Sequence, residues 1–246
     1  MNLGYHGSID TNFDCMSQCE LAIQHLYQND SMEYSLYLNI PLSVRRNCMA
    51  VVPGAGKPPI FLDRDGTIIC EVDFLSSPTQ VRLIPGVAAA IRRLNRAQRP
   101  VIVVTNQPVI AMGKCSERDL AQIHARLKEL LASEGAQLDA IYYCPHDPCA
   151  RTFGGVVELQ IECDCRKPKT GMILRAAADF GLDLTNAWLI GDKTVDIRTA
   201  RNAALRSGLV LTGHGGRDGK YADAPDEVFD ALPDAVAHIL GPVTEQ

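Results

Sequence analysis

The chain has 246 residues, and its 24 Lys plus Arg against 29 Asp plus Glu give a formal net charge of −5. Hydrophobic residues make up 46% and charged residues 22%, the proportions of a globular protein with enough apolar side chains for a core. The mild acidity argues against binding nucleic acid through bulk positive charge, and no apolar run approaches the roughly 20 residues of a membrane-spanning helix.

Nine cysteines are present, an odd number that cannot be fully paired within one chain. Residues 1–10 lack the basic and apolar regions of a signal peptide, so we expect a cytoplasmic protein with reduced thiols. Clustered cysteines in that compartment indicate metal or redox chemistry more often than disulfides.

Residues 1–58 show few clear periodic runs and end in a linker rich in Pro and Gly at 52–59. We predict that they form an appendage in front of a catalytic domain at 59–246. Residues 14–28 have the spacing of a short amphipathic helix, in which packed thiols are the expected role of the cysteines. The alternative is a second zinc or partner site at Cys15, Cys19 and His25, while Cys48 has no assigned role.

From residue 59 onward, apolar runs typical of buried strands alternate with helical patterns. The expected strands are Ile60–Leu62, Val101–Val104, Leu138–Tyr143, Ala187–Ile190 and Ser207–Leu211. The expected helices are Val87–Ala97, Ser116–Ser133, Thr170–Phe180, Thr194–Ala204 and Pro233–Leu240. Ser116 with Asp119 predicts a capping box, and Gly181 predicts a helix end. The alternation predicts an α/β fold with a doubly wound parallel sheet.

Polar side chains gather at four points along this pattern. They are Asp63 and Asp65, Thr105 to Gln107, Arg166 to Lys169, and Asp192 with Asp196. Neighbouring carboxylates repel each other unless a cation lies between them, which implies Mg²⁺. An acid pair, a hydroxyl, a lysine and a further acid at one edge of the sheet predict a metal-dependent phosphoryl-transfer site.

This set resembles the haloacid dehalogenase superfamily of aspartate-nucleophile phosphatases over residues 59–212. Asp63-Arg-Asp65-Gly-Thr is similar to its first motif, Thr105 to its second, Lys167 to its third, and Gly191-Asp192 with Asp196 to its fourth. The resemblance implies that Asp63 forms an aspartyl-phosphate and that Asp65 acts first as general acid and then as general base. It also implies that Thr105 and Lys167 hold phosphoryl oxygens and that Mg²⁺ binds Asp63, Asp192 and the Asp65 carbonyl. Asp196 would act through water or support Lys193.

Two chelating pairs, Cys144-Pro-His146 and Cys163-Asp-Cys165, are joined by one loop. Three thiolates and one imidazole suit a closed, tetrahedral Zn²⁺ with a structural role. Buried thiols without metal are the alternative. Cys149 is a spare candidate ligand, and we expect Cys70 and Cys115 to be packed thiols.

A zinc loop that leads into Cys165-Arg-Lys-Pro is similar to the D-glycero-D-manno-heptose 1,7-bisphosphate phosphatases and to the related histidinol-phosphate phosphatases. The resemblance implies removal of the 7-phosphate from a small sugar bisphosphate. The substrate-binding residues that it implies are Asp73, Asn106, Gln107, Arg166 and Lys193. The sequence departs from the family's pattern at Glu71–Phe74, at Pro108–Val109 and in a zinc loop longer than usual.

Neither of the intervals 63–105 and 105–167 has room for a separate cap domain. We therefore expect an open active site, with specificity that comes from loops. The resemblance implies a Rossmann-like fold, and we also expect a monomer. We hypothesise that zinc stiffens the loop carrying Arg166 and Lys167, so that both cations are positioned before substrate binds.

Three alternatives remain open. The first is a histidinol-phosphate phosphatase, and the second is a zinc-stabilised binding module without catalysis. The third, a nucleic-acid 3′-phosphatase, would need a basic groove and stacking aromatics, and the net charge of −5 counts against it.

Overall fold

A computed structural model describes residues 56–150 and 154–241 of the chain. The expected helix at 14–28, the alternative site at Cys15, Cys19 and His25, and Cys48 lie outside the described residues. The boundary between appendage and catalytic domain stays a prediction.

A six-stranded parallel sheet forms the centre of the described part, with strand order β3-β2-β1-β4-β5-β6. The strands are β1 (Ile60–Leu62), β2 (Val101–Asn106), β3 (Ala140–Cys144), β4 (Trp188–Gly191), β5 (Arg206–Val210) and β6 (Glu227–Phe229). This order is that of a doubly wound sheet, in which ligands bind where the strand order reverses, between β1 and β4. The expected fold class is confirmed.

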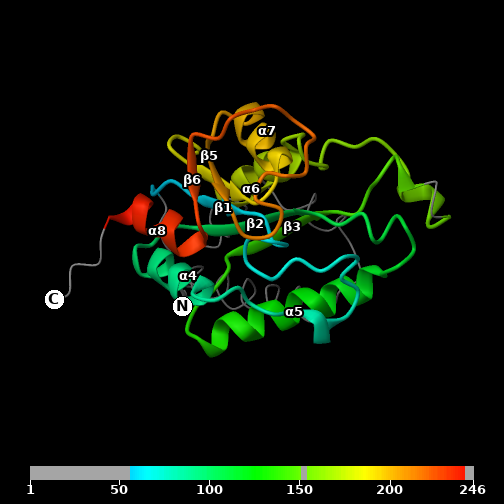
Figure 1. Ribbon diagram of the computed structural model, residues 1–246, viewed down its shortest axis with the longest axis horizontal. Helices are drawn as coiled ribbons and strands as arrows, with labels where there is room; N and C mark the ends of the chain where they lie inside the picture. The colour runs from blue at the N-terminus through cyan, green and yellow to red at the C-terminus, as the bar shows by residue number, and fades with distance from the viewer. Residues whose placement is uncertain (1–55, 151–153, 242–246) are drawn as a thin grey trace, which may run out of the picture. The chain divides into compact units, whose positions relative to one another are not determined.

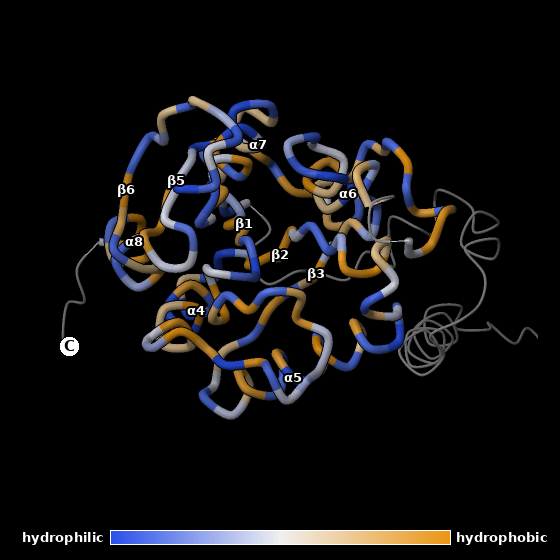
Figure 2. Tube along the Cα trace, turned by 45° about the vertical axis from the view of Figure 1, so that its right-hand side comes forward, coloured by the Kyte–Doolittle hydropathy of each residue, from blue (hydrophilic) through white to orange (hydrophobic). Residues whose placement is uncertain are grey.

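Helices cover both faces of the sheet (Figure 1). The helices α4 (Val87–Arg96), α5 (Glu117–Ser133) and α8 (Leu232–Leu240) lie on one side, and α6 (Gly171–Phe180) and α7 (Thr194–Asn202) lie on the other. Two short 3-10 turns, η1 (Pro78–Gln80) and η3 (Val157–Leu159), lie in the connections. In Figure 2 the helices change between hydrophobic and hydrophilic along their turns, as expected when only one side of a helix is buried.

The strand side chains divide between two hydrophobic cores. Ile60 and Leu62 of β1 belong to the core under α4, α5 and α8, whereas Phe61 belongs to the core under α6. All three are fully buried. Alternate residues of a strand point to opposite faces, so a continuous apolar run serves both cores at once.

The local end signals behave as expected. Ser116 caps α5 in a capping box with Asp119, and Gly181 ends α6 with a left-handed φ of 61°. The expected strands and helices are present with ends shifted by one or two residues, and β6 was not predicted. Its three residues, Glu-Val-Phe, are too few to show a periodic pattern.

The connection from β1 to β2 holds a flap at residues 70–80, which ends in η1, and then α4. No separate cap domain lies within the described residues between the motifs. The sheet edge that carries the site residues is therefore covered only by loops. Among the described residues, no helix is both long enough and apolar enough to cross a membrane.

Candidate active site

Asp63 follows β1 at the switch point of the sheet and is 4% exposed. Its Oδ1 accepts a hydrogen bond from the backbone N–H of Arg64 at 2.8 Å and lies 3.0 Å from Nζ of Lys167. Burial alone would raise the pKa of Asp63, but the positive charges of Lys167 and Lys193 outweigh it and lower that pKa. Asp63 is thus an ionised carboxylate, the form that a nucleophile requires.

Asp65, two residues later, has a carboxylate held from two sides. Arg64 donates to both of its oxygens, from Nη2 at 2.9 and 2.8 Å and from Nε at 3.1 Å. Gln107 donates from Nε2 to Asp65 Oδ2 at 2.8 Å and to Thr105 Oγ1 at 2.9 Å. Gln107, expected to bind substrate, therefore uses its amide nitrogen to position Asp65 and Thr105.

Arg64 is fully buried, a position that no pattern in the sequence predicts. Its Nη1 lies 3.1 Å from Nε2 of His124 on α5. Burial and the charge of Arg64 lower the pKa of His124 to about 3, so this imidazole is neutral and its Nε2 can accept a hydrogen bond from the guanidinium N–H. The Arg64 side chain is thereby fixed beneath Asp65.

Lys167 lies between two buried carboxylates. Its Nζ is 2.6 Å from Asp196 Oδ1 on α7 and 3.0 Å from Asp63 Oδ1. Asp196 was expected to act through water or to support Lys193, but its carboxylate pairs with the ammonium of Lys167 and only caps the Lys193 backbone N–H, at 3.1 Å. Asp196 therefore holds the ammonium of Lys167 beside Asp63.

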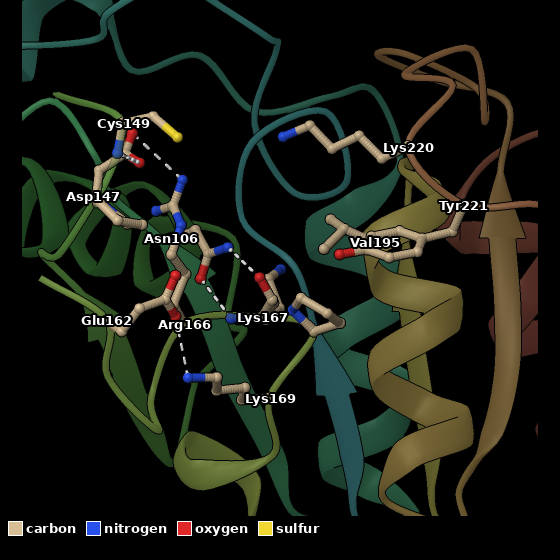
Figure 3. A pocket seen from close by; sticks show the side chains of 12 residues that line it. Asn106, Asp147, Cys149, Glu162, Arg166, Lys167, Lys169, Val195, Lys220 and Tyr221 are labelled. Atoms are coloured by element: carbon tan, nitrogen blue, oxygen red, sulfur yellow. Dashed lines mark hydrogen bonds and ion pairs between the residues drawn. The ribbon is translucent and has the colours of Figure 1, made fainter.

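Asn106, the last residue of β2, joins the same segment. Its side-chain amide donates to the carbonyl of Lys167 at 3.1 Å and accepts from the Lys167 N–H at 2.9 Å. These two hydrogen bonds connect the end of β2 to the segment that follows the cysteine loop (Figure 3). The orientation of Lys167 is thus set by both its side chain and its backbone.

Asp192 follows β4 and is fully buried. One of its oxygens accepts the backbone N–H of His214 at 2.8 Å, while Oδ1 has no hydrogen-bond partner among the described residues. Burial and the negative charge of Asp63 raise the pKa of Asp192 to about 8. The nearest cation to this Oδ1 is the Lys193 ammonium, at 3.9 Å. A buried carboxylate oxygen without a hydrogen bond, beside two more carboxylates, fits a bound divalent cation, which would favour the ionised form.

Carboxylate oxygens of Asp63, Asp192 and Asp196 lie within 4.8 Å of one another. All-oxygen donors of this kind suit Mg²⁺. The side-chain carboxylate of Asp65 is hydrogen-bonded to Arg64 and Gln107. Binding of Mg²⁺ by the backbone carbonyl of Asp65 stays a prediction.

The flap after β1 contributes a residue that the sequence did not single out. Glu71 accepts from Lys193 Nζ at 2.9 Å and lies 3.7 Å from Nε2 of His214. Asp73, the flap residue expected to bind substrate, is exposed, and none of the hydrogen bonds or ion pairs among the described residues joins it to the other site residues, so its role stays a prediction. The pattern Glu-x-Asp in the flap marks both acidic residues as candidates but does not distinguish Glu71 from Asp73.

A pocket of about 410 Å³ adjoins Asn106 and Lys167. Arg166 lines it, donating from Nη1 to the carbonyl of His146 at 2.8 Å and lying 3.4 Å from Asp147 Oδ2 (Figure 3). The volume of the pocket lies in the range of small-molecule sites. Arg166 is thus positioned by residues of the cysteine loop and faces open space next to Lys167.

Cys144, His146, Cys163 and Cys165 come together as the sequence predicts. The three sulfur atoms are 3.2 to 3.5 Å apart, and Nδ1 of His146 is 3.3 Å from the sulfur of Cys165 and 3.7 Å from that of Cys144. Tetrahedral Zn²⁺ with bonds of about 2.3 Å to sulfur holds its ligands roughly 3.5 to 3.8 Å apart. The donor set and its spacing therefore fit zinc.

The remaining cysteines of the described residues differ from one another. Cys115 is buried, as expected, but Cys70 is exposed, so the prediction of a packed thiol there is wrong. Cys149 is exposed and lines the pocket rather than joining the four-residue cluster.

Comparisons with known proteins agree with this geometry. A family model described as HAD-hydrolase-like matches residues 164–235. D-glycero-D-manno-heptose-1,7-bisphosphate 7-phosphatase of Thermosynechococcus vestitus is 43% identical over 189 residues, which cover 74% of this chain and 95% of the relative. The chain belongs to the heptose bisphosphate phosphatase family of haloacid dehalogenase-like hydrolases. The Pseudomonas aeruginosa member named D-glycero-beta-D-manno-heptose-1,7-bisphosphate 7-phosphatase is 38% identical over 183 residues, 74% of this chain and 96% of the relative.

Two solved structures also resemble the chain. D,D-heptose 1,7-bisphosphate phosphatase from B. bronchiseptica, complexed with magnesium and phosphate, has a TM-score of 0.65 at 32% identity and covers 74% of this chain and 98% of that one. A putative HAD-like phosphatase from Mesorhizobium loti has a TM-score of 0.64 at 34% identity, and the match covers 78% of this chain and 90% of that one. The chain is thus a phosphatase of this family, and the alternative of a non-catalytic binding module is set aside.

Proposed function

We propose that the protein removes the 7-phosphate of D-glycero-D-manno-heptose 1,7-bisphosphate in a Mg²⁺-dependent reaction. The observation that carries the proposal is the pairing of Asp63 with Lys167 at 3.0 Å, next to a pocket that Arg166 lines. A nucleophile beside a phosphate-binding cation, with a further cation in the same pocket, suits a substrate that carries two phosphates. The names of the relatives support the same substrate.

In this proposal Asp63 attacks the phosphorus of the 7-phosphate and forms an aspartyl-phosphate. Asp65, positioned by Arg64 and Gln107, donates a proton to the departing sugar oxygen and then takes one from the water that hydrolyses the intermediate. Lys167 and Thr105 bind the phosphoryl oxygens. Mg²⁺, held by Asp63, Asp192 and the Asp65 carbonyl, would neutralise charge on the transferred phosphoryl group.

The substrate contacts at Asn106, Arg166 and Lys193 belong to the same proposal. Arg166 lines the pocket from the cysteine loop, Asn106 from β2, and Lys193 carries its ammonium beside Glu71. Burial would lower the pKa of Lys193, but Asp63, Asp192 and Glu71 raise it, so the side chain is a cation. A role for the exposed Asp73 would require substrate to reach the flap.

The cysteine cluster belongs to the proposal as a structural zinc site. It requires Zn²⁺ bound by Cys144, His146, Cys163 and Cys165, which leaves no ligand position for water. The zinc would keep Arg166 in place through the His146 carbonyl. We further propose a cytoplasmic monomer without nucleic-acid or membrane partners, as suits an enzyme for a small anionic substrate.

Phosphate release from a panel of substrates tests the function. The panel comprises the α and β anomers of D-glycero-D-manno-heptose 1,7-bisphosphate, fructose 1,6-bisphosphate and histidinol phosphate. We expect fastest turnover of a heptose bisphosphate and none by Asp63→Asn. Preference for histidinol phosphate would replace the proposed substrate, and equal activity of the wild type and Asp63→Asn would contradict the proposed nucleophile.

A further inference from the structure

The pocket beside Lys167 has a second wall that none of the sequence motifs includes. Lys220 and Tyr221, in the connection between β5 and β6, line it opposite Arg166 (Figure 3). In Figure 3 the side chain of Lys220 extends across the pocket, with its ammonium turned towards the side of Arg166 and Asp147. Residues far apart in the sequence thus face one cavity.

The charges of the pocket lining are unevenly paired. Arg166 has Asp147 at 3.4 Å, Lys169 has Glu162 at 3.1 Å, and Lys167 has the buried pair Asp63 and Asp196. Lys220 has no ion-pair or hydrogen-bond partner among the residues that the structure describes. Its charge is therefore available to an anion that enters the pocket.

The segment that carries Lys220 is fastened to α7 on both sides of the lysine. Asp218 accepts from the N–H and the hydroxyl of Thr194, at 2.6 and 2.8 Å, and the Tyr221 N–H donates to that hydroxyl at 3.2 Å. The guanidinium of Arg198 lies 4.9 Å from the centre of the Tyr221 ring. The backbone at Lys220 is thus ordered before a ligand binds, which lowers the entropic cost of using its side chain.

We propose that Lys220 binds the phosphate that is not hydrolysed, and that it does so together with Arg166. This inference rests on the proposed function, because it assigns the second phosphate of the same sugar bisphosphate to the far wall of the pocket. Lys167 lines the pocket and pairs with the proposed nucleophile Asp63, while Arg166 and Lys220 provide two further cations from opposite sides of the pocket. Lys220 is then a specificity-determining residue that favours a bisphosphate over a monophosphate.

The test compares Lys220→Gln with the wild type on heptose 1,7-bisphosphate and on the heptose 7-phosphate that lacks the second phosphate. Loss of one charged hydrogen bond should lower kcat/KM for the bisphosphate about tenfold, through a higher KM. The kcat/KM for the monophosphate should stay within about twofold of the wild-type value. Lys128→Gln, an exposed lysine on α5, makes the same change in net charge and should leave both values unchanged. Calorimetry measures the affinity of Asp63→Asn for both sugars, with and without Lys220→Gln. It gives the preference for the bisphosphate over the monophosphate in the absence of turnover.

The outcomes separate the two proposals. An equal fall for both substrates would show a structural role for Lys220 and overturn the inference, as would an unchanged preference for the bisphosphate. If the wild type neither hydrolyses nor binds the heptose bisphosphate, the proposed function fails, and the inference that depends on it fails with it.

Discussion

The ammonium of Lys167 lies 2.6 Å from the carboxylate of Asp196, and both side chains are almost completely buried. A buried pair of this kind is costly to break, since the partner that remains keeps its charge in a medium that solvates it poorly. The pair also holds Lys167 beside Asp63, so in the proposed mechanism stability and catalysis would depend on the same contact.

Asp196→Asn should lower kcat more than it raises KM, because the amide keeps the size of the side chain but no longer fixes the ammonium beside Asp63. We expect a loss of about 10- to 100-fold in kcat and of about 1 to 3 kcal/mol in the free energy of unfolding. Steady-state kinetics and urea denaturation measure the two. Asp223, which pairs with Arg198 and Arg201 on the outer side of α7, offers the matched control Asp223→Asn, which should keep full kcat. Normal kcat in Asp196→Asn would contradict a positioning role.

Gly66→Ala should weaken Mg²⁺ binding. A Cβ at residue 66 would lie 2.2 Å from Oδ2 of Asp192, and the φ of +75° already disfavours a side chain. Because the carboxylate of Asp192 would have to move, the Mg²⁺ concentration for half-maximal activity should rise at least about tenfold, a loss of one good ligand. Gly154→Ala is the matched control, since its φ of +81° imposes the same backbone cost but its Cβ meets nothing within 4 Å. Equal Mg²⁺ dependence in both variants would argue against Asp192 as a ligand.

Removal of zinc should lower both thermal stability and substrate affinity. The Arg166 guanidinium donates to the carbonyl of His146, and His146 belongs to the cysteine cluster, so loss of the metal frees the pocket cation. We expect a chelator followed by Mg²⁺ replenishment to raise KM for the bisphosphate and lower Tm, and added Zn²⁺ to reverse both. Elemental analysis should give one zinc per chain in the wild type and less in Cys163→Ser. Full activity and unchanged Tm after zinc loss would defeat the stiffening hypothesis.

His124 should make the protein sensitive to acid. Burial and Arg64 lower its pKa from 6.5 to about 3, so the unfolded chain binds a proton at this site between these pH values and the folded chain does not. Stability from this site is therefore complete above pH 6.5 and is lost as the pH falls towards 3. At pH 5 the free energy of unfolding is lower by about 2 kcal/mol because of this site.

His124→Gln keeps an acceptor for Arg64 and removes the titration. Its Tm should fall less than that of the wild type between pH 7.5 and pH 5, as measured by differential scanning calorimetry. His238 is an exposed histidine whose ring lies 6.0 Å from that of Trp188 and 5.4 Å from that of Phe229, and it provides the control variant His238→Gln. The proposed acid sensitivity of His124 is wrong if His124→Gln and the wild type lose Tm in parallel.

The sequence was sufficient for the parts of the site that depend on strand ends. Asp63 directly follows a buried strand, and Asp192 follows another, so the parallel sheet alone brings them to one edge. The cysteine pairs were also predictable, because chelating spacing within a loop is local information. Helix ends followed in the same way from Ser116 and Gly181.

Contacts made by long side chains across the fold were not predictable. The Glu71–Lys193 pair joins residues 122 positions apart, and Arg64 meets His124 across 60 positions. Flap residues Glu71 and Asp73 look equivalent in the sequence, and only the backbone path decides which one meets Lys193. Lys220 follows no strand directly, and its direction is set by Asp218 and Thr194, whose pairing is tertiary.

Asn106 contacts both residues that flank the cysteine loop, which is the segment from 145 to 166. Cys144 is its partner in the β2–β3 register, and Lys167 forms two hydrogen bonds with its side chain. Both ends of the segment 145–166 are therefore held at Asn106, so the length of the segment can change without moving either end. A change in the length of this segment would therefore reshape the rim of the site while Lys167 stays in register.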